Sequence, residues 1–264
     1  MINLSIILPT INEADNLKIL IPEIIKSLKN VENVDFEIIV SDDGSSDNTK
    51  ELLLLLNLEH KNVHLHERTS APSLPMSIWD GIEQSKNDYV LWMDADGSMP
   101  AKTVKELVLL LKDNPESVIV GSRFVDGGAY KGIVELEDKS MLKAILNVYK
   151  SNDTVLGMIL SNLFNKLLRF IFSSKVHDIT SGFIVGKKDY FSIESFNKVS
   201  YGEYFILVIA DLISSDINII EKGYVCETRK YGSSKTATSL LQLVNRGYPY
   251  IVTAIKVRNY GNKR

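Results

Sequence analysis

The chain has 264 residues, of which 45% are hydrophobic, and 30 Lys/Arg against 33 Asp/Glu give a formal net charge of −3. This length suits one large α/β domain or two small ones, and the hydrophobic content excludes a disordered chain. Cys226 is the only cysteine, which excludes an intrachain disulfide and fits a reducing compartment.

The charge is unevenly distributed along the chain. From Lys222 to the C-terminus there are nine basic residues and one acid, Glu227, so the part of the chain before Lys222 has a net charge of about −11. A basic segment of this kind suggests a phosphate, a phospholipid surface or nucleic acid as partner, although an ordinary solvated terminus has the same pattern. We find no signal peptide and no run of the ~18–20 apolar residues that span a bilayer, so we expect a soluble or peripheral protein.

Strands and helices alternate through the first half of the sequence. Apolar runs predict strands at 4–10, 36–40, 63–66, 89–93 and 117–121. Apolar spacing of three and four predicts helices at 17–28, from about 47, at 76–85 and at 101–112. This alternation predicts a parallel sheet with helices on both faces.

The second half of the sequence is less regular. We interpret an insertion at about 128–157 as a lid over the ligand edge of the sheet. The helix expected at 156–172 is apolar nearly all round, so we expect it to be partly buried, with lipid contact as the alternative. Beyond it we expect strands at 179–185, 217–221 and 223–227, a helix at 204–213, and basic amphipathic helices from about 239 onward.

Polar side chains follow four of the predicted strands, namely Asn12/Glu13, Asp42/Asp43, Asp94/Asp96 and Ser122/Arg123. The carboxyl ends of parallel strands share one edge of a sheet, where ligands bind. Carboxylates repel phosphate, so a nucleoside diphosphate at this edge would need a divalent cation, and Asp94-Ala95-Asp96 can supply oxygen ligands for Mg²⁺ or Mn²⁺. The plainer interpretation is an acidic cap for the helix that starts near Ala101.

Six short segments together resemble the family 2 glycosyltransferases, most closely the dolichyl-phosphate mannose synthase and polyprenyl-phosphate glycosyltransferase branch. They are LPTINE (8–13), DDGS (42–45), MDAD (93–96), GSR (121–123), DITSGF (178–183) and RKYGSSK (229–235). Each segment alone is weak evidence for the family, but all six in the same order are strong evidence. The resemblance implies a GT-A fold, which is a Rossmann-like, mostly parallel sheet flanked by helices, over residues 1–236. Residues 237–264 would then form a basic, amphipathic helical tail.

The resemblance also implies the activity and its ligands. It indicates a metal-dependent, inverting transfer of a sugar from a UDP- or GDP-linked donor to a lipid phosphate or a glycan. The metal would be Mg²⁺ or Mn²⁺. It implies no nucleic-acid partner, and it suggests peripheral contact with the cytoplasmic face of the membrane.

Particular residues take roles by the same resemblance. The residues that would contact the nucleoside or its phosphates are Pro9, Asn12, Glu13, Asp42, Asp43 and Arg123. The catalytic and anion-binding candidates are Asp94, Asp96, Asp178, Arg229 and Lys235, with Asp94, Asp96 and Ser98 at the metal. If the acceptor is a hydroxyl, Asp178 or Glu203 is the candidate base; each could instead hold a turn or cap a helix.

Three positions depart from the family pattern. Ser98 stands where relatives often carry glutamine, which weakens the expected metal site. Asn162 stands where many relatives carry an arginine that binds the acceptor phosphate, and residues 71–75 (APSLP) stand where relatives have a glycine-rich loop. These departures leave the identity of the acceptor and of the sugar undetermined. The rival hypotheses are a nucleotidyltransferase, which would want a basic glycine-rich loop where Pro9–Glu13 stands, and a degenerate, non-catalytic member of the fold.

Overall fold

The computed structural model describes residues 1–130, 154–172, 174–227, 231 and 240–261. The strands are β1 (Ile2–Thr10), β2 (Val34–Asp42), β3 (Val63–Glu67), β4 (Tyr89–Trp92), β5 (Val118–Ser122), β6 (Ala129–Tyr130), β7 (Ile184–Lys187), β8 (Ile219–Gly223) and β9 (Val225–Cys226). The helices are α1 (Ala14–Leu28), α2 (Thr49–Glu59), α3 (Leu74–Gln84), α4 (Ala101–Asp113), α7 (Thr154–Phe172), α8 (Tyr204–Ser214) and α9 (Leu240–Gly261), with short 3₁₀ turns at Lys188–Tyr190 and Ile193–Ser195.

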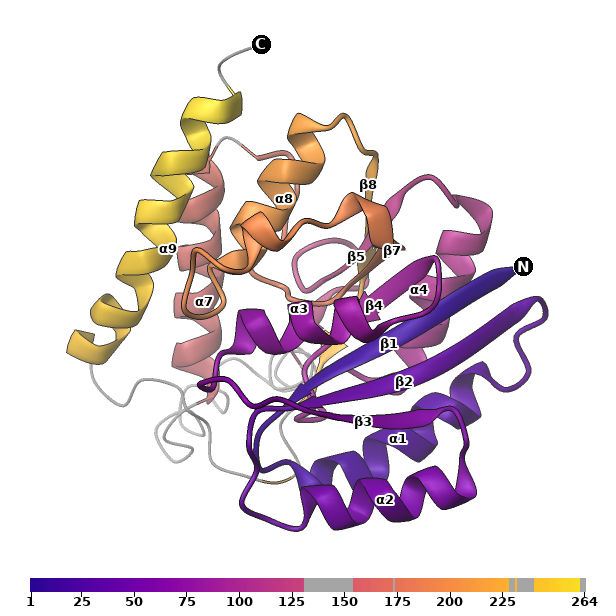
Figure 1. Cartoon of the computed structure of the whole chain (residues 1–264). Helices are drawn as coiled ribbons and strands as arrows, with labels where there is room; N and C mark the ends of the chain where they lie inside the picture. Colours follow the sequence, from indigo (N-terminus) through magenta and orange to yellow (C-terminus); the bar gives the residue numbers. More distant parts are fainter. Residues whose placement is uncertain (131–153, 173, 228–230, 232–239, 262–264) are drawn as a thin grey trace, which may run out of the picture.

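Among the described residues, seven strands form one sheet in the order β3-β2-β1-β4-β7-β5-β8. All neighbours pair in parallel except β7, which runs antiparallel to both β4 and β5. The remaining strands therefore end at the same edge of the sheet. This confirms the predicted mostly parallel α/β fold (Figure 1).

Helices cover both faces of this sheet (Figure 1). Side chains alternate along β1, so that Ile6 belongs to the core beneath α1, α2 and α4, while Ile7 belongs to the core beneath α3, α7, α8 and α9. Both side chains are completely buried. Strands buried on both faces explain the nearly continuous apolar runs of the sequence.

The apolar helix expected at 156–172 is α7, and it is partly buried, as predicted. Leu168 and Phe172 lie in the core, whereas Leu163, Leu167 and Phe170 are exposed. The helix expected near the C-terminus is α9, which packs against α7 and α8. Among the described residues we find no helix that combines the length and the hydropathy needed to span a bilayer.

One predicted strand, 179–185, is wrong over residues 179–183. Only Ile184–Lys187 is a strand, because the residues before it form a turn held by side chains. Ser181 Oγ donates to the Gly121 carbonyl, and Gly182 has φ +70°, which extended backbone does not allow. Most of the predicted lid, residues 131–153, lies outside the described residues, as does the boundary expected at 236, so both stay predictions.

Candidate active site

A cavity of about 300 Å³ opens at the edge where the parallel strands end. Its walls come from the loops after β1, β2 and β4, from the segment before α3 and from the segment before α8. It is lined by Pro9, Thr10, Ile11, Glu13, Asp43, Pro72, Ser73, Leu74, Asp94, Ala95, Asp96, Ser200 and Tyr201. The fold thus brings together five of the residues predicted from the sequence: Pro9, Glu13, Asp43, Asp94 and Asp96.

The Asp94–Asp96 turn sits directly on the buried core. Trp92, the last residue of β4, is completely buried, and its Nε1 donates to Tyr204 Oη over 3.0 Å. Asp96 is 6% exposed, and its Oδ1 accepts a 2.9 Å hydrogen bond from the Ser98 amide. Gly97 between them has φ +76°, a conformation that glycine adopts without strain. The backbone therefore holds both carboxylates on a rigid base.

These carboxylates fit a divalent cation that is bound together with a diphosphate. Asp94 and Asp96 line the same cavity and offer the hard oxygen ligands that Mg²⁺ and Mn²⁺ prefer. In the described residues, no group of three or more His, Cys, Asp or Glu side chains is placed to hold an ion by itself. The other ligands would have to be phosphate oxygens and water, as is usual for Mg²⁺. The Ser98 side chain is not among those that line the cavity.

Asp43 is held by a buried cation that the sequence analysis missed. Arg68 has a side chain only 2% exposed and forms ion pairs with Asp43 and, at 2.5 Å, with Asp80. The other Asp43 oxygen accepts from the Ser73 amide over 2.9 Å. Arg68 directly follows β3. A search for polar residues at the ends of predicted strands, which identified the other candidates, could therefore have identified Arg68 as well. This pairing fixes the 68–73 loop against the cavity.

Asn12 and Asp42 lie beside the cavity rather than in its wall. The two Asp42 carboxylate oxygens accept hydrogen bonds from the backbone N–H and the hydroxyl of Ser45. The Ser45 hydroxyl oxygen in turn accepts from the backbone N–H of Asn12 over 2.8 Å. Asn12 Oδ1 accepts from the Ser46 amide over 2.7 Å. These bonds join the loop after β1 to the loop after β2. The structure gives both residues a part in shaping the site, and their direct contact with a nucleoside stays a prediction.

Arg123 and Asp178 form a bidentate ion pair in which the Asp178 side chain is completely buried and the Arg123 side chain is 15% exposed. Two nitrogens of the guanidinium donate to the two carboxylate oxygens over 2.8 Å each, and the Arg123 amide adds a third bond of 2.9 Å. Burial opposes the charge on Arg123, but the adjacent Asp178 carboxylate outweighs it and raises the guanidinium pKa well above its usual value. Asp178 is completely buried and lines no wall of the cavity. We therefore regard it as a positioning residue for the turn before β7 and do not assign it the base role.

The remaining predicted residues fall outside the described part of the chain. Arg229 and Lys235 belong to segments whose placement the structure does not describe. Their role at an anion stays a prediction. Ser200 and Tyr201, by contrast, line the cavity although the sequence had not singled them out; the nearby candidate Glu203 is not among the lining residues.

The loop at 200–203 is packed closely against α9. A Cβ atom on Gly202 would overlap the Tyr250 hydroxyl oxygen and would lie 3.2 Å from Tyr250 Cζ. Burial raises the pKa of Tyr250, so this side chain is a neutral phenol at pH 7. The last helix of the chain thus contacts the same loop that contributes Ser200 and Tyr201 to the cavity.

Replacing Gly202 with alanine is expected to lower the free energy of unfolding by about 1–3 kcal/mol, because the new methyl group overpacks the Tyr250 contact. The loss should be smaller in a Tyr250→Phe background, where the overlapping oxygen is absent. Urea denaturation of the four proteins of this double-mutant cycle measures the difference. Equal losses in both backgrounds would show that Tyr250 does not hold the loop.

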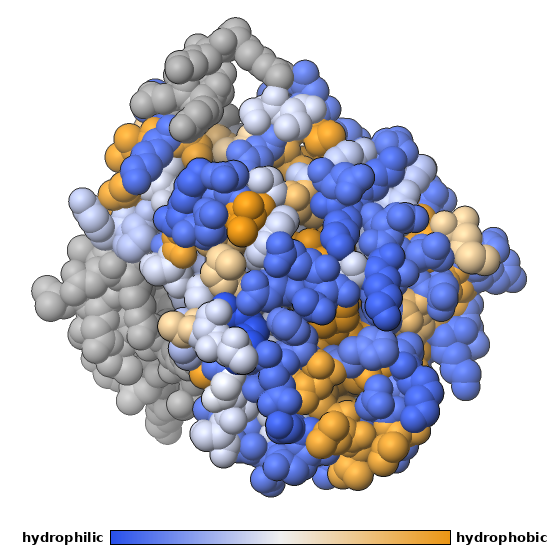
Figure 2. Space-filling view, viewed as in Figure 1, coloured by the Kyte–Doolittle hydropathy of each residue, from blue (hydrophilic) through white to orange (hydrophobic). Residues whose placement is uncertain are grey.

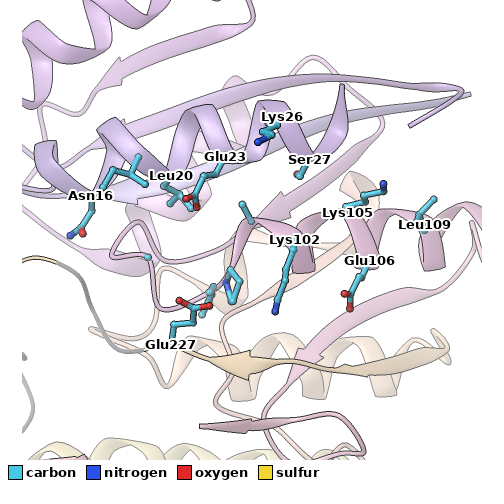
Figure 3. Close-up of a pocket in the computed structure, with 15 residues that line it drawn as sticks. Asn16, Leu20, Glu23, Lys26, Ser27, Lys102, Lys105, Glu106, Leu109 and Glu227 are labelled. Atoms are coloured by element: carbon cyan, nitrogen blue, oxygen red, sulfur yellow. The ribbon is translucent and has the colours of Figure 1, made fainter. Parts of the chain in front are cut away.

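A second and larger hollow, of about 680 Å³, lies between α1 and α4. Figure 3 shows Glu23 and Lys26 of α1 on one side, Lys102, Lys105 and Glu106 of α4 on the other, and Glu227 at one end. Its three lysines and three glutamates balance in charge. We take the smaller cavity as the candidate site, because that one contains the strand-end carboxylates.

A mostly parallel sheet with paired carboxylates after its strands is the architecture of a GT-A glycosyltransferase. Solved structures of glucosyl-3-phosphoglycerate synthase from Mycobacterium tuberculosis share this fold. One, in complex with Mn²⁺, UDP and glucosyl-3-phosphoglycerate, has a TM-score of 0.61 and 17% identity over 98% of this chain and 80% of its own. A profile described as glycosyl transferase family 2 matches residues 5–193, and the chain therefore belongs to that family.

Curated relatives agree with this assignment. A dolichol-phosphate mannosyltransferase of Pyrococcus furiosus is 33% identical over 124 residues, and a dolichyl-phosphate beta-glucosyltransferase of Trichomonas vaginalis is 30% identical over 128 residues. These matches cover 47% and 46% of this chain but only 34% and 40% of the relatives' own lengths. The poly(ribitol-phosphate) beta-N-acetylglucosaminyltransferase TarP of Staphylococcus aureus is 27% identical over 232 residues, which is 84% of this chain and 68% of TarP.

Proposed function

We propose that this chain transfers a sugar, with inversion, from a UDP- or GDP-linked donor to a lipid phosphate of the polyprenyl type. The observation that carries the proposal is the cavity in which Asp94 and Asp96 face the loops after β1 and β2. The named activities of the dolichyl-phosphate relatives support the acceptor. The UDP bound in the glucosyl-3-phosphoglycerate synthase structures supports the donor class.

The described residues suggest how the cavity would work. Pro9, Glu13 and Asp43 would face the nucleoside, and Asp94 with Asp96 would hold Mg²⁺ or Mn²⁺ against the diphosphate. When bound, the cation would stabilise the charge that develops on the leaving diphosphate. A lipid phosphate is already an anion at neutral pH, so its attack on the anomeric carbon needs no general base. Positioning by the cavity walls would then supply much of the catalysis.

Nucleotide titrations test this proposal directly. UDP and GDP are titrated by calorimetry with Mn²⁺, with Mg²⁺ and with EDTA, and we expect one of them to bind with a strong dependence on the cation. Hydrolysis and transfer with a panel of nucleotide sugars and polyprenyl phosphate then identify donor and acceptor. If neither nucleotide binds in the presence of metal, the chain is a non-catalytic member of the fold and the proposal fails.

A saccharide hydroxyl is the second candidate acceptor, and one buried carboxylate next to the cavity favours it. Glu203 is 3% exposed, its Oε1 accepts from the Ser200 amide over 3.0 Å, and its Oε2 is buried without a hydrogen-bond partner. Glu203 does not itself line the cavity, but Ser200 and Tyr201 beside it do, and unlike Asp178 it has a carboxylate oxygen without a hydrogen-bond partner that could accept a proton from an acceptor hydroxyl. The match to TarP over most of the chain points the same way.

Replacing Glu203 with glutamine separates the two acceptors. If a hydroxyl is the acceptor, kcat should fall by about two to four orders of magnitude, as for loss of a general base. If a lipid phosphate is the acceptor, kcat per folded molecule should stay within a few-fold of the parent. Donor binding, measured separately, confirms in both cases that the variant cavity is intact.

A lipid-phosphate acceptor would place the reaction at a membrane surface. We propose that the chain acts as a peripheral protein at the cytoplasmic face. The basic segment after Lys222 supports this, since anionic lipids attract basic surfaces.

A further inference from the structure

An apolar stripe on α7 faces solvent. Leu163, Leu167 and Phe170 are 57%, 46% and 79% exposed, and their spacing of four and three places them on one side of the helix. The opposite side carries Leu168 and Phe172 into the core. A helix that needed only to cover the sheet would carry polar residues on its outer side.

The neighbouring helix α9 has a second apolar stripe. Tyr248 and Ile255 are 66% and 52% exposed and lie two turns apart on the same side of α9. The rings of Phe164 on α7 and Tyr250 on α9 are 5.8 Å apart, so the two helices pack side by side (Figure 1). Figure 2 shows apolar atoms at the upper left of the view, where α9 lies.

The charge on this helix pair has a single sign. Neither α7 nor α9 contains an aspartate or glutamate, whereas together they contain Lys166, Arg169, Arg246, Lys256 and Arg258. The whole chain, by comparison, has a formal net charge of −3. Lys166, Lys256 and Arg258 are exposed. Apolar side chains flanked only by cations are the composition of helices that lie flat on an anionic bilayer.

We propose that the outer side of α7 and α9, which we call the α7–α9 face, is the surface that docks on an anionic membrane. This inference rests on the proposed transfer to a membrane lipid phosphate and names the surface that would meet the lipid. A protein partner would be expected to need acidic groups opposite these cations, but the bilayer supplies both an apolar layer and anionic headgroups. The packing of Tyr250 on Gly202 also joins α9 to the loop at the cavity. The helix that meets the membrane would therefore also support the wall of the site.

Vesicle binding tests the α7–α9 face. The chain is sedimented with phosphatidylcholine vesicles prepared with and without phosphatidylglycerol. We expect binding that requires phosphatidylglycerol and that falls at least tenfold in the Leu167→Ser/Phe170→Ser variant, because the apolar side chains that would enter the bilayer are gone. A Lys166→Gln/Lys256→Gln variant should bind more weakly and lose much of its salt dependence.

Helix α2 offers a matched control. Leu55 and Leu58 of α2 are 62% and 68% exposed. Figure 2 shows apolar atoms at the bottom of the view, where α2 lies. Acidic Glu51 and Glu59 stand on the same helix. A Leu55→Ser/Leu58→Ser variant removes as much exposed apolar surface elsewhere, and it should bind vesicles as the parent does.

Three outcomes would overturn the docking proposal: no vesicle binding by the parent, equal loss in the α2 control, or a parent dimer that the Leu167→Ser/Phe170→Ser variant converts to monomer. The last would make the face a protein interface. Metal-dependent nucleotide binding is measured on the same proteins without vesicles. If nucleotide binding persists while vesicle binding is absent, the docking surface is wrong and the donor site stands.

Discussion

The Asp96→Asn variant is expected to lose sugar transfer by about a thousandfold while keeping its fold. The asparagine side chain would retain an oxygen to accept from the Ser98 amide, so the turn after β4 should survive. The substitution would remove the negative charge that we expect to hold the cation, and electrostatic groups at a developing charge contribute roughly 10²–10³ in kcat or more. Turnover with the best donor, together with circular dichroism, measures both parts of the expectation.

The control for this variant is Asp113→Asn at the far end of α4, where the side chain is exposed and away from the cavity. It should leave kcat unchanged. Mn²⁺-dependent nucleotide binding should weaken only in Asp96→Asn. If that variant retains metal-dependent binding and turnover, Asp96 does not hold the cation, and the proposed role of the Asp94–Asp96 turn is wrong.

The Arg123→Met variant is expected to be much less stable than the parent. It leaves the Asp178 carboxylate completely buried without its cation, and breaking a buried pair from one side costs about 3–5 kcal/mol. For a domain of this size such a loss lowers Tm by roughly 10 °C. Arg123→Lys should fall between Arg123→Met and the parent, since lysine cannot make the bidentate contact. Thermal unfolding of the three proteins measures these differences.

Lys187→Met provides the matched control, because it breaks an ion pair with Glu116 that lies at the surface. Its Tm should match that of the parent. The folded Arg123→Met protein also reports on function. An unchanged KM for the donor would assign Arg123 a structural role, whereas a raised KM would support the predicted contact with phosphate. An unchanged Tm would refute the importance of the pair.

The sequence alone determined the fold class, and it predicted where along the chain the residues of the candidate site lie. Apolar runs identified the strands because a strand buried on both faces has little room for polar residues, and three of these runs were followed by carboxylates. Unpaired charge cannot remain in a buried sheet, so Asp94, Asp96 and Asp43 had to lie at its edge. Their shared cavity follows from the parallel direction of the strands, which the alternation with helices had predicted.

Only the tertiary structure decided which polar groups face the cavity and which are paired with each other. Arg123 was predicted to face phosphate, yet its charge is met by Asp178 from 55 residues further along the chain. Arg68 joins Asp43, and Tyr250 packs on the loop beside Tyr201, again across long separations. The periodicity of a sequence specifies which side of a helix or strand a residue occupies, but partners from distant segments are chosen by three-dimensional packing. For that reason the Asp94–Asp96 turn was predictable from the sequence, while the pairing of the charges around it was not.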